Sequence, residues 1–207
     1  MLTNPIEIEK RSMEIIESEL TVSLSEEIKP IVKRVIHATA DFSFAESMYF
    51  SPNAVERIRA MIKEGATIVT DTNMALSGIN RRAADTLNVK LICDMASKEV
   101  ALQAKERGVT RASILAERAL SIKGYKLLVC GNAPTFLMSL LDTLQGIVPK
   151  DIAVVGVPVG FVNVVEAKEA LRDSGLTCLA AMGRRGGSNV AAAIVNALMY
   201  SIEGVRA

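Results

Sequence analysis

The chain has 207 residues, half of them hydrophobic and only 4% aromatic, which is enough to build one domain with a full core. Its 24 basic residues nearly balance its 23 acidic residues, whereas proteins that bind nucleic acid usually carry a basic excess. Residues 1–5 show no secretory leader pattern, and the apolar run 127–144 is interrupted by Gly131 and Asp142. We therefore expect a single cytoplasmic domain, residues 1–207, with no nucleic-acid or membrane partner.

The N-terminal part of the chain predicts three helices. The first, residues 4–20, begins with an Asn-Pro pair that is typical of a helix start. Apolar residues spaced by three and four predict a second helix, which opens near Ser23 and Glu26 and ends at His37. A third helix is predicted within residues 51–65, where Gly65 provides the stop.

From residue 66 onward, short apolar runs alternate with helical segments. Five runs predict strands at 66–70, 90–93, 126–130, 152–156 and 177–181. Helices are predicted at 97–107, 110–121, 134–144, 163–173 and 188–202. In the fourth of these, Asn163 and Glu166 fit a capping pattern, while the earlier segment 41–51 is expected to be irregular or briefly extended.

The apolar runs are continuous rather than alternating, which is typical of strands buried on both faces of a parallel sheet. We therefore predict an α/β fold: a single doubly wound domain with a mostly parallel, largely buried sheet of about five or more strands, flanked by helices. The N-terminal helices, within residues 4–40, are expected to pack on this sheet domain.

Three cysteines, Cys93, Cys130 and Cys178, each fall in a predicted buried strand. Their odd number and their spacing match no metal or redox motif, so we interpret them as reduced core residues. One histidine and scattered carboxylates do not assemble a zinc or iron site either. We therefore expect no metal.

His37 is the only histidine, and histidine is the residue type whose charge changes near neutral pH. It is the first candidate for proton transfer. A histidine at the end of a helix can also be a simple cap, because positive charge is stabilising there. With one histidine, no Ser-His-Asp triad can be built.

Polar and glycine-rich segments follow the predicted strands, at the edge where open α/β sheets bind ligands. The glycines of 183–189 allow backbone amides to hold an anion at a helix start, although ordinary turns use glycine as well. The long apolar loop 156–163 suits a flat or apolar ligand. Asp71 is equally suited to cap a helix or to contact a ligand, and 131–135 also fits a helix start.

A specific set of motifs runs along the whole chain: Arg11-Ser12, Ile36-His37-Ala38, Asp71 with Met74 and Gly78-Ile79, Thr110-Arg111, Gly131-Asn132-Ala133-Pro134-Thr135, Gly156-Val157-Pro158-Val159-Gly160-Phe161-Val162 with Glu166 and Lys168, and Gly183 with Gly186-Gly187-Ser188. In residues and order, this set resembles the precorrin-8X methylmutases (cobalt-precorrin-8 methylmutases) of corrin biosynthesis. The Asn-Ala-Pro-Thr and Pro-Val-Gly-Phe-Val segments are its most specific parts.

The resemblance implies an isomerase that moves a methyl group from C-11 to C-12 of the macrocycle, giving hydrogenobyrinate or cobyrinate. The family's general acid or base falls on His37. Because the methyl group stays on the same molecule, the resemblance implies no cofactor or methyl donor. It also implies a homodimer with the tetrapyrrole substrate bound near the subunit interface.

The resemblance further assigns a substrate site whose arginines match the acetate and propionate side chains of the macrocycle. The expected substrate-binding residues are Arg11, Ser12, Arg34, Asp71, Asn80, Arg81, Arg111, Asn132, Pro158, Gly160, Gly186, Gly187 and Ser188. Within this set, we expect the backbone amides of the 183–188 loop to hold a substrate carboxylate.

Two other functions compete with this interpretation. One is a nucleotide-dependent oxidoreductase or transferase that uses the glycine-rich edge, but the dinucleotide fingerprint is missing from the sequence. The other is a non-catalytic tetrapyrrole carrier with the same pocket.

Overall fold

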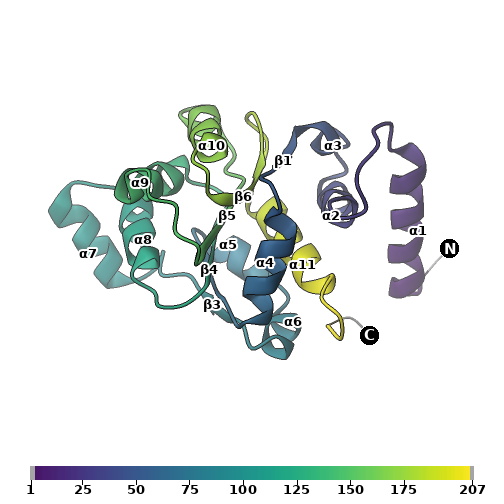
Figure 1. The fold of residues 1–207 in the computed structure, drawn as a ribbon, viewed down its shortest axis with the longest axis horizontal. Coiled ribbons are helices and arrows are strands. Elements are labelled where there is room, and N and C mark those ends of the chain that lie inside the picture. The colour runs from purple at the N-terminus through teal and green to yellow at the C-terminus, as the bar shows by residue number, and fades with distance from the viewer. Residues whose placement is uncertain (1–2, 206–207) are drawn as a thin grey trace.

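Within residues 3–205, which the computed structural model describes, six strands form one sheet in the order β1-β6-β5-β4-β2-β3 (Figure 1). The strands are β1 Met48–Phe50, β2 Thr67–Thr70, β3 Lys90–Ile92, β4 Lys126–Cys130, β5 Ile152–Gly156 and β6 Thr177–Ala181. Every neighbouring pair is parallel except β1 with β6. The prediction of a mostly parallel α/β sheet is therefore confirmed.

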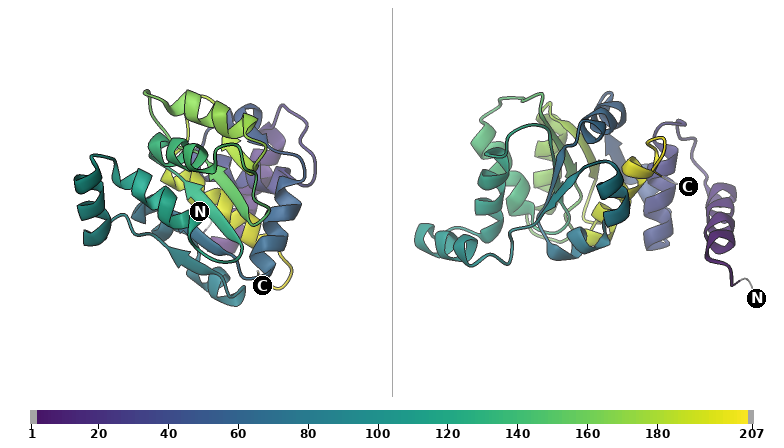
Figure 2. Two further views of the ribbon diagram at one scale, coloured as in Figure 1. Left: turned by 60° about the vertical axis from the view of Figure 1, so that its left-hand side comes forward. Right: turned by 90° about the horizontal axis from the view of Figure 1, so that it is seen from below.

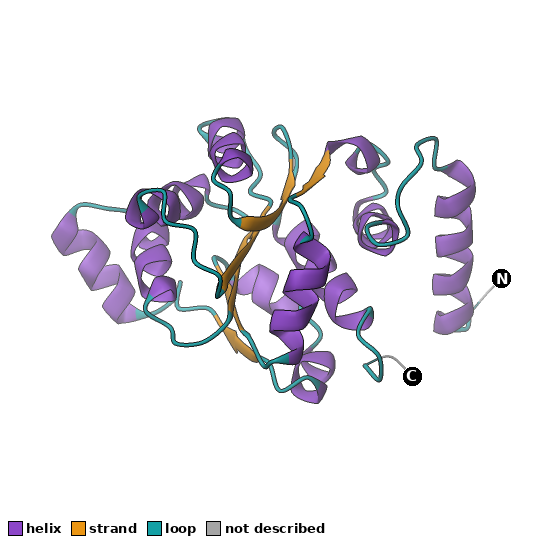
Figure 3. Ribbon diagram, in the orientation of Figure 1, coloured by secondary structure: helices purple, strands orange, loops and turns teal. Residues whose placement is uncertain are grey.

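Helices cover both faces of this sheet, so the molecule has three layers (Figure 3). The helices are α1 Pro5–Glu19, α2 Lys29–Thr39, α3 Phe44–Ser47, α4 Ala54–Lys63, α5 Asn73–Gly78, α6 Arg81–Thr86, α7 Lys98–Arg107, α8 Arg111–Leu120, α9 Pro134–Leu144, α10 Val164–Asp173 and α11 Ser188–Tyr200. Leu127 and Val129 of β4 face the core beneath α2, α4 and α11, and Leu128 faces the core beneath α8, α9 and α10. Alternate residues of one strand thus enter two cores, which explains the continuous apolar runs.

The five predicted strands lie where the apolar runs placed them. All residues of β4, β5 and β6 are buried, as expected for central strands. The additional strand β1 lies in the segment expected to be irregular or briefly extended, and it pairs antiparallel with β6, Met48 opposite Ala181. It places the end of the N-terminal segment beside the carboxyl end of β6.

Helix starts were predicted with mixed success. The side chain of Asn4 caps α1, since its oxygen accepts the amide of Ile6 at 2.9 Å. The predicted start near Ser23 and Glu26 was wrong: α2 begins at Lys29, where the proline at its second position needs no amide partner. The capping pattern at Asn163 was wrong too, because Asn163 is left-handed (φ 58°) and its side chain makes no capping bond.

The sequence did not predict the two short helices α5 and α6 between β2 and β3. Thr72 and Asn80 cap them by accepting the amides of Ala75 and Ala83. Gly78 ends α5 directly against α11, where an added Cβ would lie 2.7 Å from the Cβ of Ala192. The glycine thus lets the β2–β3 connection lie directly on the last helix.

The three cysteines are free thiols. Cys130 and Cys178 are fully buried, as predicted, at the end of β4 and within β6. Cys93 is only partly buried because it lies just beyond β3, an edge strand, so its placement in a buried strand was wrong.

The helix α1 lies at the outer edge of the molecule, against α2 (Figure 2). Ile16 is its one fully buried residue, and ion pairs join it to α2, Glu17 with Lys33 at 2.8 Å among them. The second N-terminal helix, α2, packs along α11. Within residues 3–205, no helix has the length and apolarity needed to cross a bilayer.

Candidate functional site

The order of the strands places a topological switch point between β2 and β4. From β2 the chain proceeds outward to β3, and from β4 it proceeds outward on the other side to β5 and β6. At such a switch point the loops beyond the carboxyl ends of the strands diverge, and open α/β sheets bind ligands there. The loops at this edge, here called the rim, are 71–72, 131–133, 157–163 and 183–187.

Asp71 organises the centre of the rim. Its buried carboxylate accepts the backbone amides of Gly131 at 2.8 Å, Asn132 at 2.8 Å and Ala133 at 2.9 Å. Burial raises the pKa of Asp71, and these three amides act in the opposite direction. Asp71 is therefore neither a helix cap nor exposed to a ligand; it holds the loop on which the exposed Asn132 lies.

Ser188 connects this loop region to α11. Its hydroxyl lies 2.8 Å from that of Thr72, and 8% of the residue is exposed. Thr72 also caps α5, so this pair of hydroxyls joins the loop after β2 and the starts of α5 and α11. Ser188 thus lies at the rim, with its side chain largely engaged within the protein.

The loop between β5 and α10 carries the apolar surface of the rim. Pro158 is buried, whereas Phe161 and Val162 are 82% and 75% exposed. The guanidinium of Arg184 lies 5.4 Å from the centroid of the Phe161 ring. The amide of Gly160 donates to the Arg184 carbonyl at 3.2 Å, which joins this loop to the next one. An aromatic ring and a cation therefore lie side by side at the rim.

The loop between β6 and α11 packs tightly on its neighbour. A Cβ at Gly186 would lie 2.2 Å from the carbonyl oxygen of Val157, and Gly187 has a φ of 129°. The Gly187 amide donates to the Val157 carbonyl at 2.9 Å. This amide is occupied within the chain, so Gly187 has a structural role and an anion must use other groups of the loop.

His37 lies in the last turn of α2, where its side chain is exposed. The helix ends at Thr39, and Asp41, two residues further on, forms an ion pair with Arg185 of the rim at 2.9 Å. A hydrogen bond from Ser43 and the charge of Arg185 lower the pKa of Asp41. The segment that carries His37 is thus attached to the rim at the β6 side.

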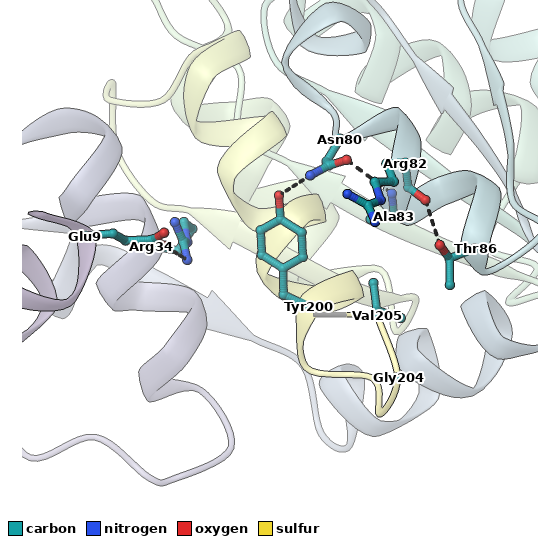
Figure 4. Close-up of a pocket in the computed structure, with 9 residues that line it drawn as sticks. All are labelled: Glu9, Arg34, Asn80, Arg82, Ala83, Thr86, Tyr200, Gly204 and Val205. Atoms are coloured by element: carbon teal, nitrogen blue, oxygen red, sulfur yellow. Dashed lines mark hydrogen bonds and ion pairs between the residues drawn. The ribbon is translucent and has the colours of Figure 1, made fainter. Parts of the chain in front are cut away.

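A second group of expected residues lines a pocket of about 380 Å³ between α1, α2, α6 and the end of α11. Figure 4 shows Glu9 and Arg34 on one side, Tyr200 in the middle, and Asn80 with Arg82 opposite. Arg34 forms an ion pair with Glu9 at 2.7 Å and lies 5.6 Å from the Tyr200 ring centroid. Asn80 donates to the Tyr200 hydroxyl at 2.7 Å. Arg34 and Asn80 therefore share one pocket.

The remaining expected residues are spread over the surface. Arg11 and Ser12 lie on α1, where Arg11 pairs with Glu14 at 3.1 Å and Ser12 donates to the Ile8 carbonyl. Arg81 is exposed and borders a different hollow, which Asp85 also lines.

Arg111 is exposed at the first position of α8. The preceding residue, Thr110, donates to the hydroxyl of Thr135 at 3.4 Å, in the first turn of α9. Because α9 begins directly after the 131–133 loop, this contact joins the start of α8, where Arg111 lies, to the start of α9.

One chain thus brings most of the expected residues to the rim, Arg34 and Asn80 to the pocket, and Arg11 with Ser12 to α1. Four further residues border these sites: Phe161, Arg184, Arg82 and Tyr200. The first two lie in loops whose composition already indicated a ligand site. Nothing in the local sequence indicated that Tyr200, near the chain end, would meet α2 and α6. In residues 3–205, no group of three His, Cys, Asp or Glu side chains is arranged to hold a metal.

Fold and rim together define a doubly wound α/β protein whose rim carries exposed apolar and cationic side chains. A family model described as precorrin-8X methylmutase matches residues 7–201. Cobalt-precorrin-8 methylmutase of Salmonella typhimurium is 46% identical over 176 residues, covering 83% of this chain and 80% of that protein. Precorrin-8X methylmutase of Pseudomonas aeruginosa is 38% identical over 174 residues, covering 83% of each.

A crystal structure of precorrin-8X methylmutase from Thermus thermophilus has the same fold. It superposes with a TM-score of 0.84 at 34% identity, covering 93% of this chain and 96% of that chain. The chain belongs to the precorrin-8X methylmutase family. It is accordingly an isomerase, a methylmutase of cobalamin biosynthesis.

Proposed function

We propose that this enzyme moves the methyl group at C-11 of precorrin-8X or cobalt-precorrin-8 to C-12, giving hydrogenobyrinate or cobyrinate. The observation that carries the proposal is the family match over residues 7–201 together with 46% identity to a cobalt-precorrin-8 methylmutase. The exposed ring of Phe161 and the nearby arginines suit a flat macrocycle with carboxylate side chains.

In this proposal His37 acts as the general acid and base. Protonation of a ring nitrogen or an adjacent position makes the conjugated system electron-poor, which favours migration of the methyl group with its bonding electrons. The proton returns to His37 when the product forms, so substrate and product have the same composition. The exposed position of His37 at the end of α2 leaves its imidazole accessible to a substrate.

The arginines at the rim bind the carboxylates of the substrate in this scheme. Both Arg111 and Arg184 are exposed, Arg184 beside the Phe161 ring and Arg111 next in the chain to Thr110, which contacts the start of α9. The planar guanidinium donates two parallel hydrogen bonds to one carboxylate. No cofactor is assigned, because the transferred methyl group starts and ends on the same molecule.

We also propose that the enzyme works as a cytoplasmic homodimer with the substrate near the interface. The helix α1 carries exposed apolar residues, among them Ile6 and Ile15 at 78% and 41% exposure. Such residues supply a surface that a second copy of the chain would cover. The expected substrate-binding residues lie apart in one chain, at the rim, in the pocket and on α1. In a homodimer, residues of the second copy would also lie close to them. Light scattering of the purified protein measures the oligomeric state directly.

The reaction is tested by incubating the purified enzyme with precorrin-8X and, in parallel, with cobalt-precorrin-8. Product is identified by its absorption spectrum at unchanged mass, which is the mark of an isomerisation. Both substrates are needed because relatives of both names match the chain. Tight binding without conversion would instead indicate a tetrapyrrole carrier, and no interaction with either compound would refute the proposal.

Changing Arg111 to methionine is expected to weaken substrate binding by roughly 1.5–3 kcal/mol, the range for hydrogen bonds to charged groups. Lysine at this position should restore only part of the affinity, because an ammonium lacks the planar fork. Arg57→Met, at an exposed position of α4, is the matched control. Titration with substrate measures the effect, and equal affinities for the wild type and Arg111→Met would remove Arg111 from the site.

A further inference from the structure

Lys168 is a buried lysine that the proposed chemistry does not use. It lies in α10 with none of its surface exposed. A buried ammonium is costly unless hydrogen-bond acceptors surround it. Its Nζ donates to the carbonyl of Gly183 at 2.9 Å and to that of Arg185 at 2.6 Å. Both acceptors belong to the rim loop between β6 and α11.

These bonds fix the backbone on both sides of Arg184. The carbonyl of Arg184 itself accepts the amide of Gly160 at 3.2 Å. Three consecutive carbonyls of the loop are therefore held from within the protein, while the side chains of Arg184 and Arg185 remain exposed. Arg184 extends over Phe161, and Arg185 binds Asp41 near the end of α2.

The 183–187 loop needs such support because its three glycines leave the backbone free to adopt many conformations. Gly183, Gly186 and Gly187 all have positive φ values, of 77°, 158° and 129°. Glycines lose the most conformational freedom when a chain is ordered, so a loop that is fixed before binding avoids that entropic cost.

We propose that Lys168 is a positioning residue, which fixes Arg184 for a substrate carboxylate and Arg185 for Asp41 without touching the substrate. Through Arg185 and Asp41 it also supports the segment that carries His37. This inference rests on the proposed function for the role of Arg184, but the ordering of the loop can be measured without it.

The charge of Lys168 makes the idea testable by pH. Burial lowers the pKa of Lys168, whose neighbours include Cys130 at the end of β4, to about 8. Burial raises the pKa of Cys130 well above its usual range and that of Cys178, which lies against α10, to about 11. Both thiols therefore stay neutral between pH 7 and 9, where Lys168 loses its proton. A neutral amine forms weaker hydrogen bonds than an ammonium.

The first arm compares Lys168→Met with Lys126→Met. Lys126 is also buried, at 2% exposure, but it pairs with Asp151 at the opposite end of the sheet. We expect Lys168→Met to raise KM roughly tenfold with kcat changed less than about threefold, the size of a lost charged hydrogen bond in the loop. Lys126→Met should leave KM unchanged. Equal KM values for both variants would overturn the proposal.

The second arm starts from the pH dependence of the wild-type enzyme. In the wild-type enzyme KM should be level below pH 8 and rise above it, as Lys168 becomes neutral. The same rise should be missing in Lys168→Met and present in Lys126→Met. A rise of equal size in the wild type and in Lys168→Met would refute the positioning role.

The third arm separates this inference from the proposed function. Amide hydrogen exchange of residues 183–187 should be faster in Lys168→Met than in Lys126→Met, with or without substrate. If the wild type converts neither tetrapyrrole, the proposed function fails, and the exchange rates still decide whether Lys168 orders the loop. If Lys168→Met is active and its exchange rates are unchanged, the positioning role of Lys168 is rejected and the proposed function is retained.

Discussion

Replacing His37 with alanine is expected to lower the turnover number by about 100-fold or more, the usual contribution of a positioned acid or base. The fold should be retained, because the side chain of His37 is exposed and belongs to the last turn of α2 rather than to the core. Turnover is measured with the substrate that the wild-type enzyme converts, and circular dichroism checks the fold.

Two further variants sharpen this experiment. His37→Gln keeps a hydrogen-bonding side chain but cannot transfer a proton, so it should be nearly as inactive as His37→Ala. Lys29→Ala, in the first turn of the same helix, is the control and should keep its activity. Turnover of His37→Ala within a few-fold of the wild type would exclude His37 as the acid or base.

Replacing Asp71 with alanine is expected to lower the free energy of unfolding by roughly 3–5 kcal/mol, because three backbone amides lose their shared acceptor, a buried carboxylate, at once. The amides concerned are those of Gly131, Asn132 and Ala133. Their loop lies at the centre of the rim, so substrate affinity should fall together with stability. Chemical denaturation measures the stability as a shift of the midpoint.

The matched control is Asp142→Ala, an exposed aspartate on α9. It should change the midpoint little, because surface substitutions usually alter stability by less than about 0.5 kcal/mol. A loss below about 1 kcal/mol for Asp71→Ala would show that the loop finds other acceptors and that Asp71 does not organise the rim.

The sequence predicted the sheet well because its strands are buried on both faces. A strand with this environment is apolar at every position, and such a run remains visible without any tertiary information. Edge elements lack this signal: the residues of β1, and Cys93 just beyond β3, are only partly buried and were predicted less accurately. The short helices α5 and α6 have only six residues each, too few for an apolar pattern that would predict them. They are stabilised instead by their caps and by contact with α11.

The family, the rim loops and the candidate role of His37 also came from the sequence, because they depend on which residues occur in which order. What each side chain does was decided by the tertiary structure. Asp71 was expected to contact a ligand or cap a helix, and Lys168 was only part of the family motifs. The fold buries both side chains and directs them to backbone groups of loops about 60 and 15 residues away. Such partners are set by strand order and helix packing, and these long-range contacts leave no mark on the local sequence pattern.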